Sequence, residues 1–169
     1  MPPPGITLRP QLDADLEFAA ELYAETREEE VRPVDWPDEV KRAFLRSQFD
    51  AQWAHYSQHY HGAAFSIVER HGSRIGRLYI WHDQDDVRIV DIALCAEARD
   101  AGIGGALVRE VMDEAARSGK SASIHVERNN RALGLYQRLG FERVADHGIY
   151  YLMKWSPPPA GSGQPNTAS

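Results

Sequence analysis

The spacing of hydrophobic residues changes several times along the chain, and each change marks a predicted element. Apolar residues recur every three or four positions in two stretches, which predicts amphipathic helices over residues 13–30, with Asp13 as the N-cap, and over residues 38–60. A short alternating segment at residues 6–10 predicts a strand ahead of these helices. Residues 63–95 are rich in β-branched and aromatic residues and are interrupted by two short polar turns, which predicts three consecutive antiparallel strands.

The second half of the chain predicts an alternation of strands and helices. Helical spacing returns over residues 103–119 and 130–140, and each of these helices ends at a glycine. The strands predicted in this half are residues 121–127, 141–145 and 149–155. The element order is therefore β-α-α-β-β-β-α-β-α-β-β, and the strand-helix-strand unit in its middle should form a right-handed parallel crossover. We expect one α/β domain over residues 6–155, with helices on both faces of a mixed sheet.

Composition narrows the class of protein without indicating a reaction. The 169 residues suffice for one domain with a substantial core, and no run of about 18 apolar residues predicts a membrane span. The first residues lack the pattern of a signal peptide, and the single cysteine, Cys95, cannot form an intramolecular disulfide, so we expect a cytoplasmic protein. Residues 156–169, rich in Pro, Gly and Ser, are expected to be a disordered tail.

The formal net charge of −6 bears on the partners of the protein. Domains that bind nucleic acid through bulk charge usually carry a basic patch, so we expect no nucleic-acid partner. An excess of negative charge is compatible with attraction of cationic small molecules.

The segment Leu94–Val108 (LCAEARDAGIGGALV) combines a strand end, a glycine-rich turn and the start of a predicted helix. The first N–H groups of a helix have no intrahelical partner and lie at the positive end of its dipole, so they bind phosphate without a basic side chain. Glycine within a helix costs about 1 kcal/mol relative to alanine, and a bound diphosphate would offset that cost. The alternative is a tight connection without a ligand.

Spacing argues against two common nucleotide motifs. The dinucleotide fingerprint G-x-G-x-x-G fails because Gly102 and Gly104 are followed by Leu107 instead of a third glycine. A P-loop fails because the earlier glycine it requires is Glu114, and the tripeptide GKS at residues 119–121 lies at a helix C-terminus, where the dipole disfavours phosphate.

Two motifs together resemble the GNAT superfamily of acyl-CoA N-acyltransferases. The first, R-x-x-G-x-G, starts at Arg99, and about 25 residues later the second, N-x-x-A-x-x-L-Y-x-x-x-G-F, spans Asn129–Phe141. The resemblance covers roughly residues 6–155 and implies the GNAT fold, with acetyl-CoA as cosubstrate and no metal. The chain departs from the commonest pattern at Ala96, where proline is frequent, and at Asp100, where a small or basic residue is frequent. Neither difference removes a backbone N–H.

The resemblance also implies roles for individual residues. Backbone amides of residues 99–104, extended by Gly105, would bind the coenzyme A diphosphate. The strand ending at Leu94 would splay from its neighbour, leaving backbone groups for the pantetheine arm and the Leu94 N–H for the oxyanion. Asn129 would contact that arm or, alternatively, cap the next helix. The implied cofactor-binding residues are Ile92, Ala93, Leu94, Arg99, Asp100, Ala101, Gly102, Ile103, Gly104, Gly105, Asn129 and Tyr136.

Tyr136 matches the tyrosine that many members of the superfamily use as the general acid, and it would protonate the departing thiolate. The alternative is a purely packing role beside Leu135 and Leu139, the predicted core stripe of its helix. For the base that deprotonates the amine, Glu127 and His125 are the first candidates, Asp91 is a third, and a chain of waters remains open. Each of these three side chains could equally be a solvated or paired strand residue.

Three further features of the sequence give weaker indications of function. His55 and His59 are four residues apart on a helix, but a metal site lacks a third ligand and the H-E-x-x-H pattern. The acidic segment at residues 28–39 would favour a cationic acceptor or is simply a solvated helix end. Cys95 is expected to be a half-buried core residue.

The expected activity is transfer of an acetyl group from acetyl-CoA to the primary amine of a small molecule or peptide, by direct attack. The alternative is a non-catalytic GNAT module that holds acyl-CoA as a sensor or structural ligand. No membrane partner is expected, and the final hairpin and the long second helix could supply a homodimer surface.

Overall fold

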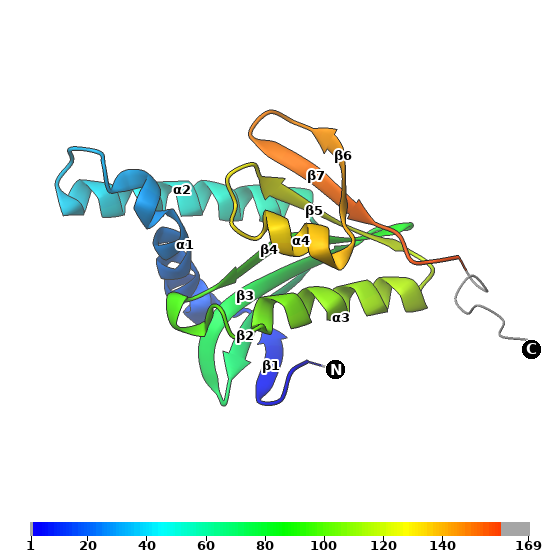
Figure 1. The fold of residues 1–169 in the computed structure, drawn as a ribbon. Coiled ribbons are helices and arrows are strands. Elements are labelled where there is room, and N and C mark those ends of the chain that lie inside the picture. The colour runs from blue at the N-terminus through cyan, green and yellow to red at the C-terminus, as the bar shows by residue number, and fades with distance from the viewer. Residues whose placement is uncertain (1, 160–169) are drawn as a thin grey trace, which may run out of the picture.

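Seven strands form one sheet within residues 2–159, the part of the chain that the computed structural model describes (Figure 1). The strand order is β1-β2-β3-β4-β5-β7-β6, with β4 and β5 parallel and every other pair antiparallel. The strands are β1 (Ile6–Pro10), β2 (Ala64–Arg70), β3 (Ser73–His82), β4 (Asp86–Leu94), β5 (Ser121–Glu127), β6 (Glu142–Asp146) and β7 (Tyr150–Trp155). The helices are α1 (Leu16–Val31), α2 (Asp38–His59), α3 (Ile103–Arg117) and α4 (Leu133–Leu139), with short 3-10 turns η1 (Asp13–Asp15) and η2 (Ala96–Ala98).

The predicted fold class and element order are confirmed, and two helix starts differ from the prediction. Helix α1 begins at Leu16 because η1 precedes it, and the carboxylate of Asp15 accepts the N–H of Leu12 at 2.8 Å, so Asp13 is not the N-cap. Helix α4 begins at Leu133 instead of residue 130. The side chain of Asn130 accepts the N–H of Ala132 at 2.8 Å, a local hydrogen bond that competes with helix formation. Most of the predicted tail, residues 160–169, lies outside the described residues.

The helices cover both faces of the sheet (Figure 1). The apolar side of α3 packs on one face, where residues such as Leu107 and Val111 share a core with Ile89 and Ile124. Helices α1 and α2 pack on the opposite face and form a second core around Phe49. No helix among residues 2–159 combines the length and hydrophobicity that crossing a membrane would require.

Strands β4 and β5 separate halfway along their length, which agrees with the splayed sheet expected from the sequence. Their pairing runs only from Asp86 with Ser121 to Ile89 with Ile124. At the same point β4 contains a bulge, because Ile89 and Asp91 pair with consecutive residues of β3 and leave Val90 unmatched. A bulge bends its strand and changes the direction of nearby side chains. The outer halves of β4 and β5 therefore diverge and leave a gap between them.

Candidate active site

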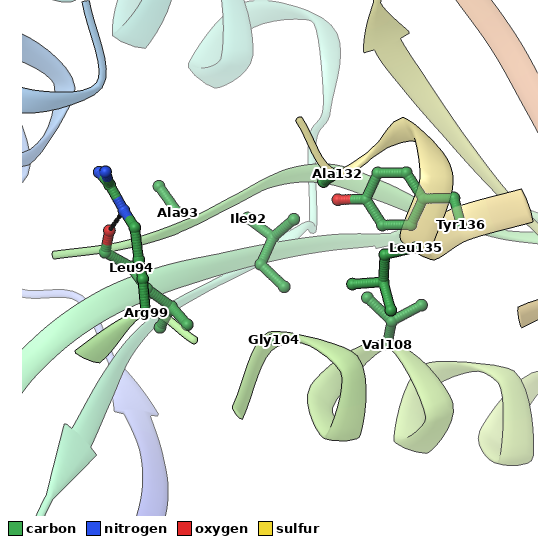
Figure 2. Close-up of a pocket in the computed structure, with 9 residues that line it drawn as sticks. All are labelled: Ile92, Ala93, Leu94, Arg99, Gly104, Val108, Ala132, Leu135 and Tyr136. Atoms are coloured by element: carbon green, nitrogen blue, oxygen red, sulfur yellow. Dashed lines mark hydrogen bonds between the residues drawn. The ribbon is translucent and has the colours of Figure 1, made fainter. Parts of the chain in front are cut away.

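A cavity of about 150 Å³ lies where β4 leaves β5, between the start of α3 and helix α4 (Figure 2). It brings together six of the predicted cofactor-binding residues: Ile92, Ala93, Leu94, Arg99, Gly104 and Tyr136. The other predicted residues do not line it: Asp100, Ala101, Gly102, Ile103, Gly105 and Asn129. Residues separated by more than forty positions in the sequence thus meet at the open end of one strand pair.

Three lining residues were not among those predicted, namely Val108, Ala132 and Leu135. Val108 lies one helical turn after Gly104, so the spacing alone could have predicted that both residues lie on the same face of the helix. Leu135 was expected in the core stripe of α4, but it lines the cavity, and Tyr136 is instead the buried residue of that helix. The ring of Tyr136 packs in the main core against Phe141, at a centroid distance of 6.1 Å.

The turn before α3 exposes backbone N–H groups. Gly102 has a φ of +78°, and a Cβ there would meet nothing within 4 Å, so the left-handed backbone rather than crowding favours glycine. The first intrahelical bond runs from the Ala106 N–H to the Gly102 carbonyl at 3.1 Å. The N–H groups of residues 103–105 therefore precede the helical ladder and lie at its positive end.

The free edge of β4 also presents backbone groups to the gap. Cys95 donates its N–H to Ile75 at 2.8 Å, and Ala93 is in register with Arg77. In an antiparallel pair this alternation directs the N–H and carbonyl of Leu94 away from β3. The Leu94 carbonyl accepts a hydrogen bond from Arg99 Nε at 3.0 Å (Figure 2), which leaves its N–H directed toward the gap.

The hydroxyl of Tyr136 points into the cavity (Figure 2). The side chain is only 4% exposed, and no described residue forms a hydrogen bond with the hydroxyl. Burial, with a smaller contribution from the negative charge of Asp91, raises the pKa of Tyr136 to about 12. The hydroxyl is therefore protonated throughout the neutral range and available as a donor.

The two first candidates for the base occupy different surroundings. Both carboxylate oxygens of Glu127 bind the guanidinium of Arg27 on α1, one of them at 2.9 Å. His125 lies on the exposed side of β5, with its ring 5.8 Å from that of His147. Burial, together with the positive charge of Arg88, lowers the pKa of His125, so it is neutral at neutral pH.

Asp91 has one bound and one open oxygen. Its Oδ2 accepts hydrogen bonds from Arg77 Nη2 at 2.8 Å and from the Tyr56 hydroxyl at 3.0 Å. Its Oδ1 accepts none from any described residue and is not buried.

The remaining predicted residues lie apart from the cavity. Asn129 is exposed in the turn between β5 and α4 and does not cap that helix, whose N-cap is Ala132. The rings of His55 and His59 stack on α2 at 4.1 Å. Cys95 is half-buried against the main core.

The acidic segment borders a groove of about 480 Å³ between α1 and α2. Acidic and basic side chains line it in equal number: Glu25, Glu28, Asp38, Arg32, Lys41 and Arg42. The groove therefore lacks the single sign of charge that would select a polycation.

Comparison with known proteins agrees with this architecture. The structure is similar to a PaiA N-acetyltransferase of Thermoplasma acidophilum in complex with coenzyme A, with a TM-score of 0.68, 18% identity and coverage of 90% of this chain and 99% of that chain. An acetyltransferase of Thermus thermophilus gives a TM-score of 0.65 at 12% identity, over 93% of this chain and 100% of that chain. Arabidopsis thaliana Naa50, in complex with the bisubstrate analogue CoA-Ac-MVNAL, gives 0.56 at 18% identity, over 90% and 99%.

At these low sequence identities, the structural similarity shows a shared fold. No curated protein matches the sequence. The family model for the acetyltransferase (GNAT) family matches residues 19–141, which is more than half of the chain. The chain therefore belongs to the acetyltransferase (GNAT) family.

Proposed function

We propose that this protein transfers an acetyl group from acetyl-CoA to a primary amine of a small molecule or peptide, by direct attack of the amine on the thioester. One observation carries the proposal. The opening between β4 and β5 brings a free strand edge, the start of α3 and an unbonded tyrosine hydroxyl to a single cavity.

The residues around the cavity fit coenzyme A. The unpaired N–H groups of residues 103–105 suit the diphosphate, and the left-handed Gly102 lets the backbone approach it closely. The outward-facing backbone of Leu94 suits the amide groups of the pantetheine arm. The coenzyme A in the Thermoplasma acidophilum structure supports this assignment. Acetyl-CoA, when bound, supplies the activated acyl carbon.

In the transfer, the amine nitrogen bonds to the acetyl carbon and the carbon–sulfur bond breaks. The Leu94 N–H would donate to the oxyanion. Tyr136 would give its proton to the departing thiolate and later recover one from solvent. A phenol with a pKa of about 12 is a weak acid for an ordinary thiolate, but burial in the same apolar cavity also raises the proton affinity of that thiolate.

Asp91 is the best placed of the predicted proton acceptors. Its Oδ1 has no hydrogen-bond partner among the described residues, whereas both oxygens of Glu127 already bind Arg27 and His125 lies on the exposed side of β5. We infer that Asp91 takes the amine proton directly or through one water. Substitution of Glu127 or His125 should then reduce turnover less than Asp91→Asn does.

The proposed acceptor is a primary amine. The bisubstrate analogue held by the Arabidopsis protein contains a peptide, which supports peptide amines as candidates. The net charge of −6 favours the approach of cationic amines at low ionic strength.

Release of free thiol from acetyl-CoA, measured against a panel of polyamines, amino sugars and short peptides, tests the proposal. Tyr136→Phe should lower kcat by roughly 100-fold while the Kd for coenzyme A stays within about twofold. Tyr60→Phe, directly after α2, is the matched control and should behave as wild type. Tight binding of acetyl-CoA with no thiol release for any acceptor would instead support the non-catalytic sensor.

A further inference from the structure

Arg77 on β3 is an almost completely buried arginine. Its side chain is 3% exposed and lies on the face of the sheet that α2 covers. The guanidinium stacks near the ring of Tyr79, 5.1 Å from its centroid, and near the ring of Phe49. Nη2 donates to Gln52 at 2.9 Å and to Asp91 at 2.8 Å.

The burial of Arg77 is costly for the fold. Its Nε and Nη1 are buried without a hydrogen-bond partner among the described residues. Unsatisfied buried donors are destabilising, and a buried ion pair is often no more stable than an apolar pair of similar volume. Stability therefore does not explain why an arginine occupies this position.

The geometry around Arg77 controls the direction of one carboxylate. Arg77 is in register with Ala93, so Asp91 is its diagonal neighbour on the same face of the sheet. The bulge at Val90 places Asp91 on this face just beyond the point where β4 leaves β5. Because Oδ2 is held by Arg77 and the Tyr56 hydroxyl, Oδ1 is the oxygen of this carboxylate that is left without a partner among the described residues.

We propose that Arg77 is a positioning residue, which orients the Asp91 carboxylate for the reacting amine. The inference rests on the proposed role of Asp91. It adds a residue outside both family motifs and outside the cavity.

Arg77 is the positively charged group among the titratable side chains that interact with Asp91. The titratable groups coupled to this carboxylate are Tyr56 from α2, Arg77 and Tyr79 from β3, and Tyr136 from α4. The three tyrosines are neutral at neutral pH, so none of them replaces the positive charge. Removal of Arg77 should therefore favour the protonated form of Asp91.

The test is the pH profile of kcat/KM with the best acceptor of the amine panel. In Arg77→Met the acid limb should move to higher pH by about one unit or more, with the KM for acetyl-CoA within about twofold of wild type. In Arg77→Lys, which keeps the positive charge, the acid limb should return most of the way to its wild-type position. Arg74→Met is the matched control, because this arginine of the same strand binds Asp15 instead, and its acid limb should stay in place. An Arg77→Met limb that coincides with wild type overturns the inference.

A second measurement needs no acceptor. The pH titration of the Asp91 carboxyl carbon by NMR should move upward in Arg77→Met relative to wild type, and an unmoved titration overturns the inference. If it moves while Asp91→Asn keeps full turnover, the positioning by Arg77 stands and the proposed role of Asp91 fails. Should Arg77→Met fail to fold, the double variant Arg77→Met/Asp91→Leu is expected to fold at least as well as wild type and to lose turnover. Unfolding of that double variant would overturn the argument that the pair is not needed for stability.

Discussion

Asp100 lies in the turn before α3 with a left-handed backbone. Its φ is 62°, a conformation that glycine adopts readily and that asparagine and aspartate adopt occasionally. Its exposed carboxylate also stands two residues before Gly102, in the turn proposed to bind the diphosphate. A diphosphate bound at this turn would be repelled by the like charge of Asp100.

Asp100→Asn should therefore tighten coenzyme A binding. Asparagine tolerates the left-handed backbone and removes only the charge, so the Kd should fall by roughly three- to tenfold at low ionic strength. Isothermal titration at two salt concentrations measures this, and the gain should shrink as salt rises. Glu97→Gln, an exposed acid in the preceding turn, is the control for net charge. An equal gain in both variants would show that the effect is not local to Asp100.

The raised pKa of Tyr136 predicts the alkaline behaviour of the enzyme. A pKa of about 12 means that the acid form is present below that pH and is lost only above it. Turnover should therefore show no loss due to Tyr136 up to about pH 10. The pH dependence of kcat in wild type and Tyr136→Phe measures this. A basic limb near pH 9 that is present in wild type and absent from Tyr136→Phe would contradict the assignment.

At the scale of elements, the first turn of α3 lies next to the end of β4. Gly104 lies in the first turn of α3 and lines the cavity, and a Cβ there would come within 3.8 Å of Leu94 Cδ1, an ordinary contact. The protein alone thus has room for a larger residue at this position. Glycine is favoured there by the space that a ligand would need rather than by the packing of the helix.

Gly104→Ala should consequently separate stability from binding. Alanine is the better helix former, so the free energy of unfolding should rise by about 0.5–1 kcal/mol. The added methyl group lies in the proposed cofactor cavity, so the Kd for coenzyme A should increase. Thermal unfolding of the free protein and titration with coenzyme A measure the two effects. A variant that is stabilised and binds as tightly as wild type would argue against binding at this helix start.

At the scale of the whole molecule, ion pairs join elements that are distant in the sequence. Asp15 binds Arg9 of β1 at 2.7 Å and Arg74 of β3 at 3.2 Å, so one buried carboxylate connects the N-terminal strand to the centre of the sheet. On the other side of the gap, Arg27 of α1 holds Glu127 of β5. Helix α1 is thereby held against both diverging strands, since Glu25 also accepts the N–H of Ala96.

Asp15 predicts how the molecule responds to acid. The hydrogen-bonded guanidinium of Arg9, aided by the Leu12 N–H and Arg74, holds the pKa of Asp15 well below its usual range. A depressed folded-state pKa contributes stability above the unfolded value of about 3.9, and that stability is lost as the pH falls through the folded value.

Asp15→Asn should lower the free energy of unfolding at pH 7 by about 1–3 kcal/mol, because charge-assisted hydrogen bonds are lost. The difference from wild type should shrink as the pH falls below about 4, because the carboxylate then protonates in the unfolded wild-type chain while it stays charged in the folded one. Urea unfolding of both proteins at neutral and acid pH measures this. A difference that stays constant with pH would indicate that the charge of Asp15 contributes little.

The amino-acid sequence by itself determined the order of the elements, the crossover between β4 and β5 and the glycine turn before α3. These features depend on local periodicity and on backbone conformations that few residues adopt, and both can be read from neighbouring positions. The part of the cavity formed by β4, α3 and α4 was expected from the resemblance to the GNAT superfamily, because the two motifs that carry the resemblance contain Arg99, Gly104 and Tyr136.

Only the tertiary structure decided how the charged residues are used. Glu127 is a predicted candidate for the base, and the fold places Arg27, one hundred positions away, against both of its oxygens. A bulge at Val90 directs Asp91 to the face of the sheet that carries Arg77, and the burial of that arginine gave no signal in the sequence. The pairing of a charge depends on neighbours in space, and these come from segments whose separation along the chain carries no periodic signal.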